Sequence, residues 1–132
     1  MIVPLGTPTV LIVDEDVGFV WWLGEIFHEL GCRVIPALNC QEALSFASAV
    51  NLAVDLIVAS QALPGVLRMT RTLQRARSAK VVAIEPSGNS HHVDLHAHAV
   101  LRRPAIGDNV SRVEWIPTVR RILALVGTRA AS

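Results

Sequence analysis

Hydrophobic residues along the 132-residue chain fall into short runs that end at acidic, turn-forming or capping residues. A continuous apolar run of four to eight residues between such signals is typical of a strand buried on both faces of a parallel sheet. On this basis we predict five strands, at about residues 9–13, 32–38, 55–60, 80–85 and 99–104.

The segments between these runs carry apolar residues at helical spacing. The clearest one follows Asp16, a predicted N-cap, and ends at Gly31. Its inward-facing positions are Phe19, Leu23, Ile26 and Leu30. A second helix is expected to begin at Asn39, with Glu42 three residues later completing a capping box.

Two further helices and one ambiguous segment complete the pattern. Residues 66–77 form a basic amphipathic helix whose inward positions are Val66, Met69 and Leu73, and residues 87–99 are polar, His-rich and only weakly helical. A closing helix has Pro117 suited to its first turn. Alternatively, the sequence SRVE at 111–114 is a capping box, and Pro117 then kinks a longer helix.

Strands and helices therefore alternate five times, without an internal repeat or linker. This order predicts an α/β fold: a doubly wound, five-stranded parallel sheet with helices on both faces and right-handed crossovers. We expect residues 1–132 to form a single domain.

Composition narrows the function classes. Hydrophobic residues make up 52% of the chain and charged residues 17%, which predicts a well-filled core and not disorder. The formal net charge of +1 disfavours a dedicated nucleic-acid binder. No apolar run reaches the roughly 18 residues of a membrane span, and no secretory leader is visible. The two cysteines lack CxxC spacing, so we expect reduced thiols in a cytoplasmic protein.

Polar side chains cluster where the predicted strands end. Asp14 and Glu15 follow the first strand, Ser60 the third, Glu85 the fourth and Arg103 the fifth. The carboxyl ends of parallel strands form the functional crevice in sheets of this type, so these five residues are the candidate site.

With these motifs in this order, the chain resembles a response-regulator receiver domain (CheY-like) over nearly its whole length. The matching motifs are LIVDED, NCQEAL, DLIVASQALPG, VVAIE and LRRP. The resemblance implies a flavodoxin-like (βα)5 fold with strand order 2-1-3-4-5 and a signalling role in a two-component system, without enzymatic activity of its own.

The resemblance also assigns roles to the five site residues, and several depart from the family pattern. Asp14 and Glu15 fall at the acidic pair that binds magnesium in the family. Ser60 stands in place of the phosphorylated aspartate, and Glu85 in place of the switch Thr or Ser unless a two-residue slip brings Ser87 into register. Arg103 replaces the family's lysine.

These departures predict a vestigial phosphorylation pocket. A serine hydroxyl is neutral and needs an adjacent base to act as a nucleophile, and a glutamate at position 85 would repel a phosphoryl group. The planar guanidinium of Arg103 suits carboxylates, so we expect it to bridge Asp14, Glu15 or Glu85. No cofactor is required, although Asp14 and Glu15 remain candidates for weak magnesium binding.

Two other clusters of polar residues are candidate binding sites. His91, His92, His96 and His98 suggest a metal site, but no Cys or carboxylate set completes it, so a polar surface segment is the favoured interpretation. The basic residues Arg68, Arg71, Arg75, Arg77 and Lys80 are interpreted as a solvated helix face, with nucleic-acid contact as the weaker alternative.

These considerations favour a receiver-like module that acts by binding a protein partner or a second copy of itself, independently of phosphorylation. The candidate partner surface is Trp21, with Glu25 and His28 beside it on the outer side of the first helix. The alternatives are an active phosphotransfer receiver with an unusual acceptor and, less favoured, an unrelated small enzyme of similar topology.

Overall fold

A computed structural model of the chain describes residues 7–49, 53–76, 78–85, 93–104 and 111–126. It contains one five-stranded sheet in the order β2-β1-β3-β4-β5, and the four pairings between neighbouring strands are all parallel. The strands are β1 (Thr9–Val13), β2 (Arg33–Ala37), β3 (Leu56–Ser60), β4 (Lys80–Glu85) and β5 (Ala99–Arg102). The predicted fold class and strand order are confirmed.

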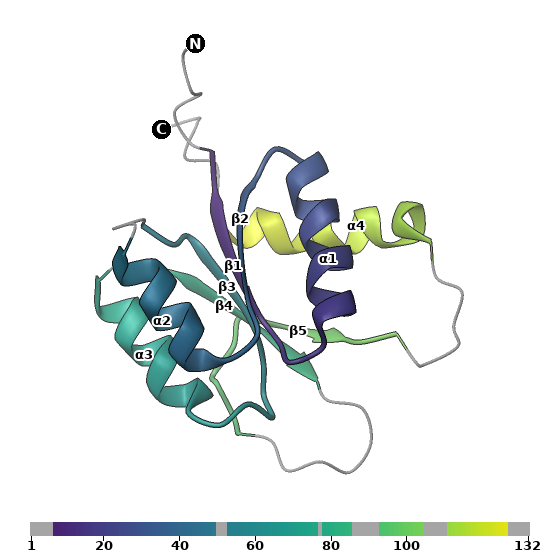
Figure 1. The fold of residues 1–132 in the computed structure, drawn as a ribbon. Helices are drawn as coiled ribbons and strands as arrows, with labels where there is room; N and C mark the ends of the chain where they lie inside the picture. Colours follow the sequence, from purple (N-terminus) through teal and green to yellow (C-terminus); the bar gives the residue numbers. More distant parts are fainter. Residues whose placement is uncertain (1–6, 50–52, 77, 86–92, 105–110, 127–132) are drawn as a thin grey trace.

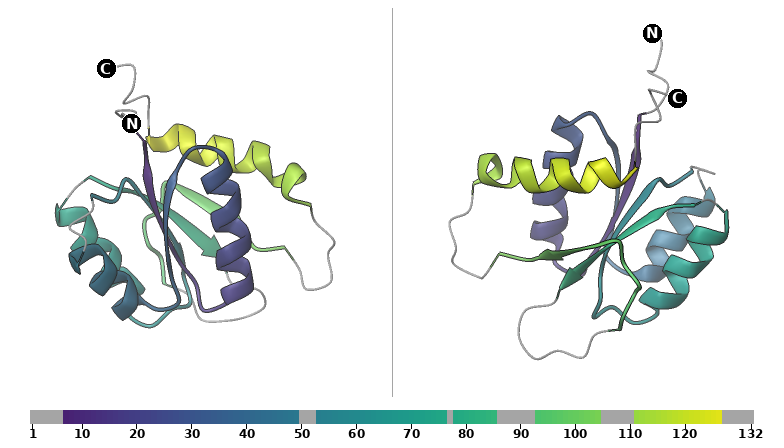
Figure 2. Two further views of the ribbon diagram at one scale, coloured as in Figure 1. Left: turned by 45° about the horizontal axis from the view of Figure 1, so that its top comes forward. Right: turned by 180° about the vertical axis from the view of Figure 1, so that it is seen from behind.

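Helices cover both faces of this sheet. They are α1 (Val17–Glu29), α2 (Cys40–Ala49), α3 (Val66–Ala76) and α4 (Arg112–Leu123), followed by a short 3-10 turn, η1 (Ala124–Val126). Helices α1 and α4 lie on one face, and α2 and α3 lie side by side on the other (Figures 1 and 2).

The alternation of side chains along the strands builds two separate cores. Val10 and Ile12 of β1 belong to the core beneath α1 and α4, whereas Leu11 and Val13 belong to the core beneath α2 and α3. Because both faces are covered, all five residues of β1 and of β3 are buried, as their continuous apolar sequences predict.

The helix starts follow the predicted capping residues. The backbone N–H of Phe19 donates to Oδ1 of Asp16 at 3.1 Å, and that of Glu42 donates to Oδ1 of Asn39 at 2.7 Å. The carboxylate of Glu42 reaches back to the N–H of Leu38 at 3.1 Å, one residue before the cap. Local sequence therefore sets where α1 and α2 leave the carboxyl edge of the sheet.

Helix α4 begins at Arg112, earlier than the start that places Pro117 in the first turn. Ser111 is its N-cap, accepting from the N–H of Glu114 at 3.3 Å, so the alternative that starts the helix at the SRVE segment is correct. Pro117 consequently lies inside the helix, and its placement in the first turn is wrong. The buried residues Val119 and Ile122 hold α4 against the core despite the proline.

The connection from β4 to β5 departs from a regular β-α repeat in its described part. Residues 93–98 contain no helix, and His96 has a left-handed backbone with φ of 51°. Leu95, only 5% exposed, packs into the α2–α3 core from this segment. His98 extends the β4–β5 pairing, since its Nδ1 accepts from the N–H of Val81 at 3.1 Å while its own N–H donates to the Val81 carbonyl.

Among the residues that the structure describes, no helix has the length and apolar character needed to cross a membrane.

Candidate functional site

The candidate site lies at the carboxyl edge of the sheet, where β1, β3 and β5 end. Asp14 directly follows β1 and is completely buried, Ser60 is the last residue of β3 and is 4% exposed, and Arg103 directly follows β5. In sheet order β1 and β3 are neighbours, and β5 lies two strands beyond β3. Arg103 nevertheless reaches the end of β1.

An ion pair between Arg103 and Asp14 dominates this edge. Nη2 of Arg103 donates to Oδ2 of Asp14, while Oδ1 of the same carboxylate accepts from the N–H of Asp16 at 2.9 Å. Both oxygens of the buried carboxylate are therefore engaged. The prediction that Arg103 binds a carboxylate of the acidic pair is correct for Asp14.

The Arg103 guanidinium also contacts Asp16, the N-cap of α1, and Phe19 in the first turn of α1. Its Nη1 lies 3.8 Å from Oδ2 of Asp16, and its Cζ lies 5.1 Å from the centroid of the Phe19 ring. A guanidinium over an aromatic face gains a cation–π attraction. The side chain is 20% exposed, and its Nε is buried without a hydrogen-bond partner among the described residues.

The other two carboxylates proposed for Arg103 lie elsewhere. Glu85 instead forms a 3.4 Å contact with Nε of Arg102, because the strand register places Glu85 opposite Arg102 in the β4–β5 pair. Glu15 is exposed and forms no ion pair with any described residue. Of the three alternatives offered for Arg103, the structure therefore selects Asp14 and not Glu85 or Glu15, and Asp16 is the second partner.

Ser60 takes part in the turn that follows β3. Its Oγ accepts from the N–H of Ala62 at 3.3 Å, and its carbonyl accepts from the N–H of Leu63 at 3.4 Å. Among the described residues, no His, Asp or Glu side chain hydrogen-bonds its hydroxyl as a general base would. Ser87, the alternative on the fourth strand, lies outside the described residues.

This arrangement does not fit the magnesium ion that the resemblance implies. A divalent ion needs several oxygen ligands, yet both oxygens of Asp14 are already hydrogen-bonded, one of them to a guanidinium. Bringing a dication to the same carboxylate would add repulsion from Arg103. In the described part of the chain, no three His, Cys, Asp or Glu side chains are grouped to hold a metal.

The described histidines have no ligand set either. His96 is exposed and lies 3.7 Å from Asp94, and His98 is hydrogen-bonded to Val81 of the sheet. His91 and His92 lie outside the described residues.

A second feature, which we call the Trp21 groove, opens between α1, the end of β2 and α2. Its volume is about 350 Å³, and its lining comprises Val17, Val20, Trp21, Pro36, Leu38, Glu42 and Phe46. Trp21 is 61% exposed, as predicted. Its neighbours are apolar, however, whereas the sequence had indicated polar ones. Four of the seven large hydrophobic side chains that are exposed in the described residues line this groove.

The polar residues predicted to flank Trp21 differ in their surroundings. Glu25 forms a 3.0 Å ion pair with Arg112 of α4, which also pairs with Glu29 at 2.6 Å. His28 is exposed on α1 and is the basic residue of its last turn. Glu25 is thus engaged with α4, and neither residue lines the groove.

The sequence did not identify the residues that surround Arg103 at the sheet edge or those that line the groove beside Trp21. Asp16 was identified as a helix cap but not as a contact of Arg103, and Phe19 was identified only as a core residue. The groove residues Leu38 and Phe46 come from separate segments, and only tertiary packing brings them to Trp21.

Comparison with known proteins relates the fold to one structural class. No protein-family model matches the chain, and no curated protein matches it in sequence. Among solved structures, a CheY-like response-regulator receiver domain from Methylobacillus flagellatus superposes with a TM-score of 0.68 at 17% identity, covering 92% of this chain and 99% of the other.

Two further structures agree. A chain from the complex of the P1 domain of CheA3 with CheY6 from R. sphaeroides matches with a TM-score of 0.68 at 27% identity, covering 90% of this chain and 99% of that one. The BeF3-activated DrrB receiver domain matches with a TM-score of 0.64 at 18% identity, covering 89% and 97%. The chain therefore has the fold of CheY-like response-regulator receiver domains.

Proposed function

We propose that this chain is a receiver-like module of two-component signalling that acts through protein–protein contacts and does not depend on phosphorylation. One observation carries the proposal: the guanidinium of Arg103 is bound to Asp14 at the edge where receiver domains carry their phosphorylation chemistry, and the strand beside it ends in Ser60.

The charges at this edge of the sheet oppose phosphorylation. A phosphorylated receiver needs an anionic acceptor, a metal and a cation free to contact the phosphoryl group. Here the acceptor position carries a neutral hydroxyl engaged in a turn, and the cation is already neutralised by Asp14 and Asp16. Moving Arg103 toward a phosphoryl group would leave Asp14 buried and unpaired, which is costly.

The Trp21 groove is the surface proposed for a protein partner. A partly exposed Trp among apolar neighbours is a favoured interface anchor, since its large surface is better covered by protein than by water. The complex of the P1 domain of CheA3 with CheY6 supports the idea that proteins of this fold meet protein partners. The proposed partner is a heterologous protein or a second copy of the chain.

Intact mass after treatment with acetyl phosphate and magnesium tests the phosphorylation-independent part. We expect no gain of about 80 Da, the mass of one phosphoryl group, in the parent chain. Ser60→Asp alone is also expected to gain none, because Arg103 still occupies Asp14. The double variant Ser60→Asp, Arg103→Lys restores the aspartate and the lysine of the family pattern, leaves Glu85 unchanged, and is the matched positive arm.

A stoichiometric gain in the parent chain, localised by peptide mapping to this edge, would show an active receiver with an unusual acceptor and would overturn the proposal. A gain in Ser60→Asp alone would show that Arg103 does not block the edge. Titration with beryllofluoride, followed by NMR, gives an independent readout, and we expect the amide resonances around Asp14 and Ser60 to stay in place.

A further inference from the structure

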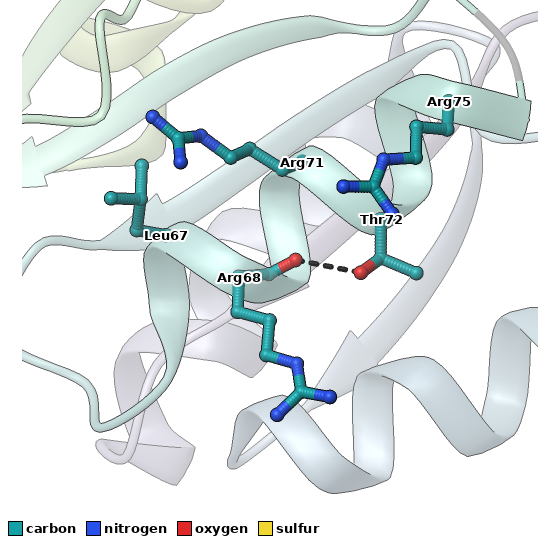
Figure 3. Close-up of a pocket in the computed structure, with 5 residues that line it drawn as sticks. All are labelled: Leu67, Arg68, Arg71, Thr72 and Arg75. Carbon is teal, nitrogen blue, oxygen red and sulfur yellow. Dashed lines mark hydrogen bonds between the residues drawn. The ribbon is translucent and has the colours of Figure 1, made fainter.

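Helix α3 presents three arginines on its outer surface. Arg68, Arg71 and Arg75, together with Leu67 and Thr72, line an open cavity of about 540 Å³ (Figure 3), and we call this surface the α3 arginine face. Successive helical residues are about 100° apart, so the three arginine positions fall within roughly 60° of arc and extend over about 10 Å of helix. Residues Val66 and Met69 hold the opposite side of α3 in the core.

The arginines of this face have no carboxylate partner among the described residues. Of the six other described arginines, Arg102, Arg103 and Arg112 each lie in an ion pair, whereas Arg33, Arg120 and Arg121 do not. No described carboxylate oxygen lies within 4 Å of the arginines of α3. Figure 3 shows Arg68 and Arg71 pointing in different directions from the helix, and the side chain of Arg75 lying beside Thr72. Within the described part of the chain, the face is therefore a concentration of positive charge without a paired carboxylate, on a chain whose net charge is only +1.

This arrangement works against the stability of the isolated helix. Like charges three and four residues apart on a helix repel each other. Arg68 also lies in the first turn of α3, which contains no acidic residue, so it meets the positive end of the helix dipole. An anionic ligand would relieve both effects, because it would neutralise all three guanidinium groups at once.

We propose that the α3 arginine face binds an acidic helical segment of a protein partner. A partner helix that carries carboxylates at positions i, i+3 and i+7 repeats the spacing of Arg68, Arg71 and Arg75, so the three pairs form in register when the two helices run parallel. Each guanidinium fork accommodates a carboxylate in a bidentate geometry. Leu67, half-buried at the N-terminal end of the face, supplies the apolar contact.

The charge distribution favours a protein helix over nucleic acid. Nucleic-acid affinity depends on the number of phosphates neutralised, and three arginines give a small contribution that salt removes readily. The chain adds no long-range positive field, because its 12 basic and 11 acidic residues nearly cancel.

Fluorescence anisotropy with a labelled, alanine-based helical peptide tests the proposal. The peptide carries glutamates at i, i+3 and i+7, and a matched peptide carries glutamines there. At low ionic strength we expect the parent chain to bind the glutamate peptide and not the glutamine peptide. The triple variant Arg68→Gln, Arg71→Gln, Arg75→Gln is expected to bind at least tenfold more weakly.

The matched control removes three positive charges elsewhere. Arg33, Arg120 and Arg121 are exposed and lie outside any ion pair with the described residues, so changing all three to glutamine alters the net charge equally. We expect less than a threefold loss in this control. Equal losses in the two triple variants, or no binding of the glutamate peptide by the parent chain, would overturn the proposal.

Two further arms complete the test. The triple Arg→Lys variant of the face keeps the charge and removes the planar fork, and it is expected to bind severalfold more weakly than the parent; it also serves if the glutamine variant unfolds. A single-stranded oligonucleotide of the same charge is expected to bind more weakly than the peptide, and tighter binding would assign the face to nucleic acid instead.

This inference rests on the proposed function only in taking the ligand to be a protein. The two proposals can fail independently. Intact mass tests phosphorylation at the sheet edge, whereas peptide anisotropy tests binding at the outer surface of α3.

Discussion

The guanidinium of Arg103 hydrogen-bonds the carboxylate of Asp14, a residue 89 positions earlier in the chain that is completely removed from solvent. This contact joins the end of β5 to the end of β1, and through Asp16 it also joins β5 to the N-cap of α1. The Arg103 side chain thus connects the ends of β1 and β5 with the start of α1 at the carboxyl edge of the sheet.

Arg103→Ala is expected to destabilise the fold substantially. Removing one partner of a buried pair leaves the other charge unpaired, which costs about 3 kcal/mol in comparable cases. We expect a clear loss in the free energy of unfolding measured by urea denaturation. The double variant Asp14→Asn, Arg103→Ala removes both charges and should recover part of that loss. A single variant as stable as the parent would show that the ion pair is absent in solution.

The same variant is expected to acquire a response to magnesium. Without Arg103, the carboxylates of Asp14 and Asp16 lose their cation, so a dication at millimolar concentration can replace it. We expect magnesium to raise the melting temperature of Arg103→Ala and to leave that of the parent unchanged. Equal responses in both would show that Arg103 does not exclude the ion.

Trp21 and Trp22 are neighbours in sequence with opposite expected roles. Trp21→Ser should change the stability of the fold by no more than about 0.5 kcal/mol, because the side chain is largely exposed. Trp22 packs against Phe19 and Trp115, so Trp22→Ser should cost about 2 kcal/mol.

Sedimentation then measures the role of the groove. If the groove joins two copies of the chain, Trp21→Ser lowers the mass of the assembled species while remaining folded. An unchanged mass distribution in a folded variant leaves a heterologous partner, and an unfolded variant would show that Trp21 belongs to the core.

The buried Cys32 thiol predicts a loss of stability in alkali. Burial raises its pKa from 9.0 to about 11. Between these values the unfolded chain releases the thiol proton while the folded chain retains it. The stabilising contribution is therefore complete below about pH 9 and is lost as pH rises toward 11.

Thermal melts across this window, compared with those of Cys32→Ala, measure the effect. The chain has no tyrosine, and the two proteins differ only at position 32, so the difference between the two curves reports chiefly on the thiol. We expect the parent to lose more stability than the variant, and its Cys32 to be alkylated slowly at pH 9. Parallel curves would contradict the prediction.

Pro117 is expected to reduce the stability of α4. It lies inside the helix, where it removes one backbone hydrogen bond. Because Pro117 is exposed, Pro117→Ala should restore that bond without disturbing the core and raise stability by about 2 kcal/mol. A decrease in melting temperature would show that Pro117 itself is needed to seat Val119 and Ile122.

The fold could be predicted from the sequence because its signals are local. The runs TVLIV and LIVAS give β1 and β3 directly, and Asp16 and Asn39 mark the starts of their helices. The start of α4 was ambiguous because Ser111 and Pro117 are both good start signals, and only burial of the helix surface decides between them.

The site was less predictable because it depends on register and on long-range packing. Arg103 could be expected to find a carboxylate, but the choice of Asp14 over Glu85 depends on the β4–β5 register that pairs Glu85 with Arg102. No sequence pattern contains that register. The same holds for the Trp21 groove, whose walls come from α1, β2 and α2.

The aromatic contact between α1 and α4 gives the protein an internal optical reporter. The rings of Trp22 and Trp115 meet edge to face with centroids 5.0 Å apart, and the chain contains no tyrosine. Near-ultraviolet circular dichroism of this pair therefore reports directly on whether the two helices are seated together. Trp21 is the more exposed tryptophan, at the rim of the groove, so acrylamide is expected to quench its emission more readily than that of the packed pair. Occupation of the groove and docking of α4 can thus be followed separately, at two wavelengths, in the unlabelled chain.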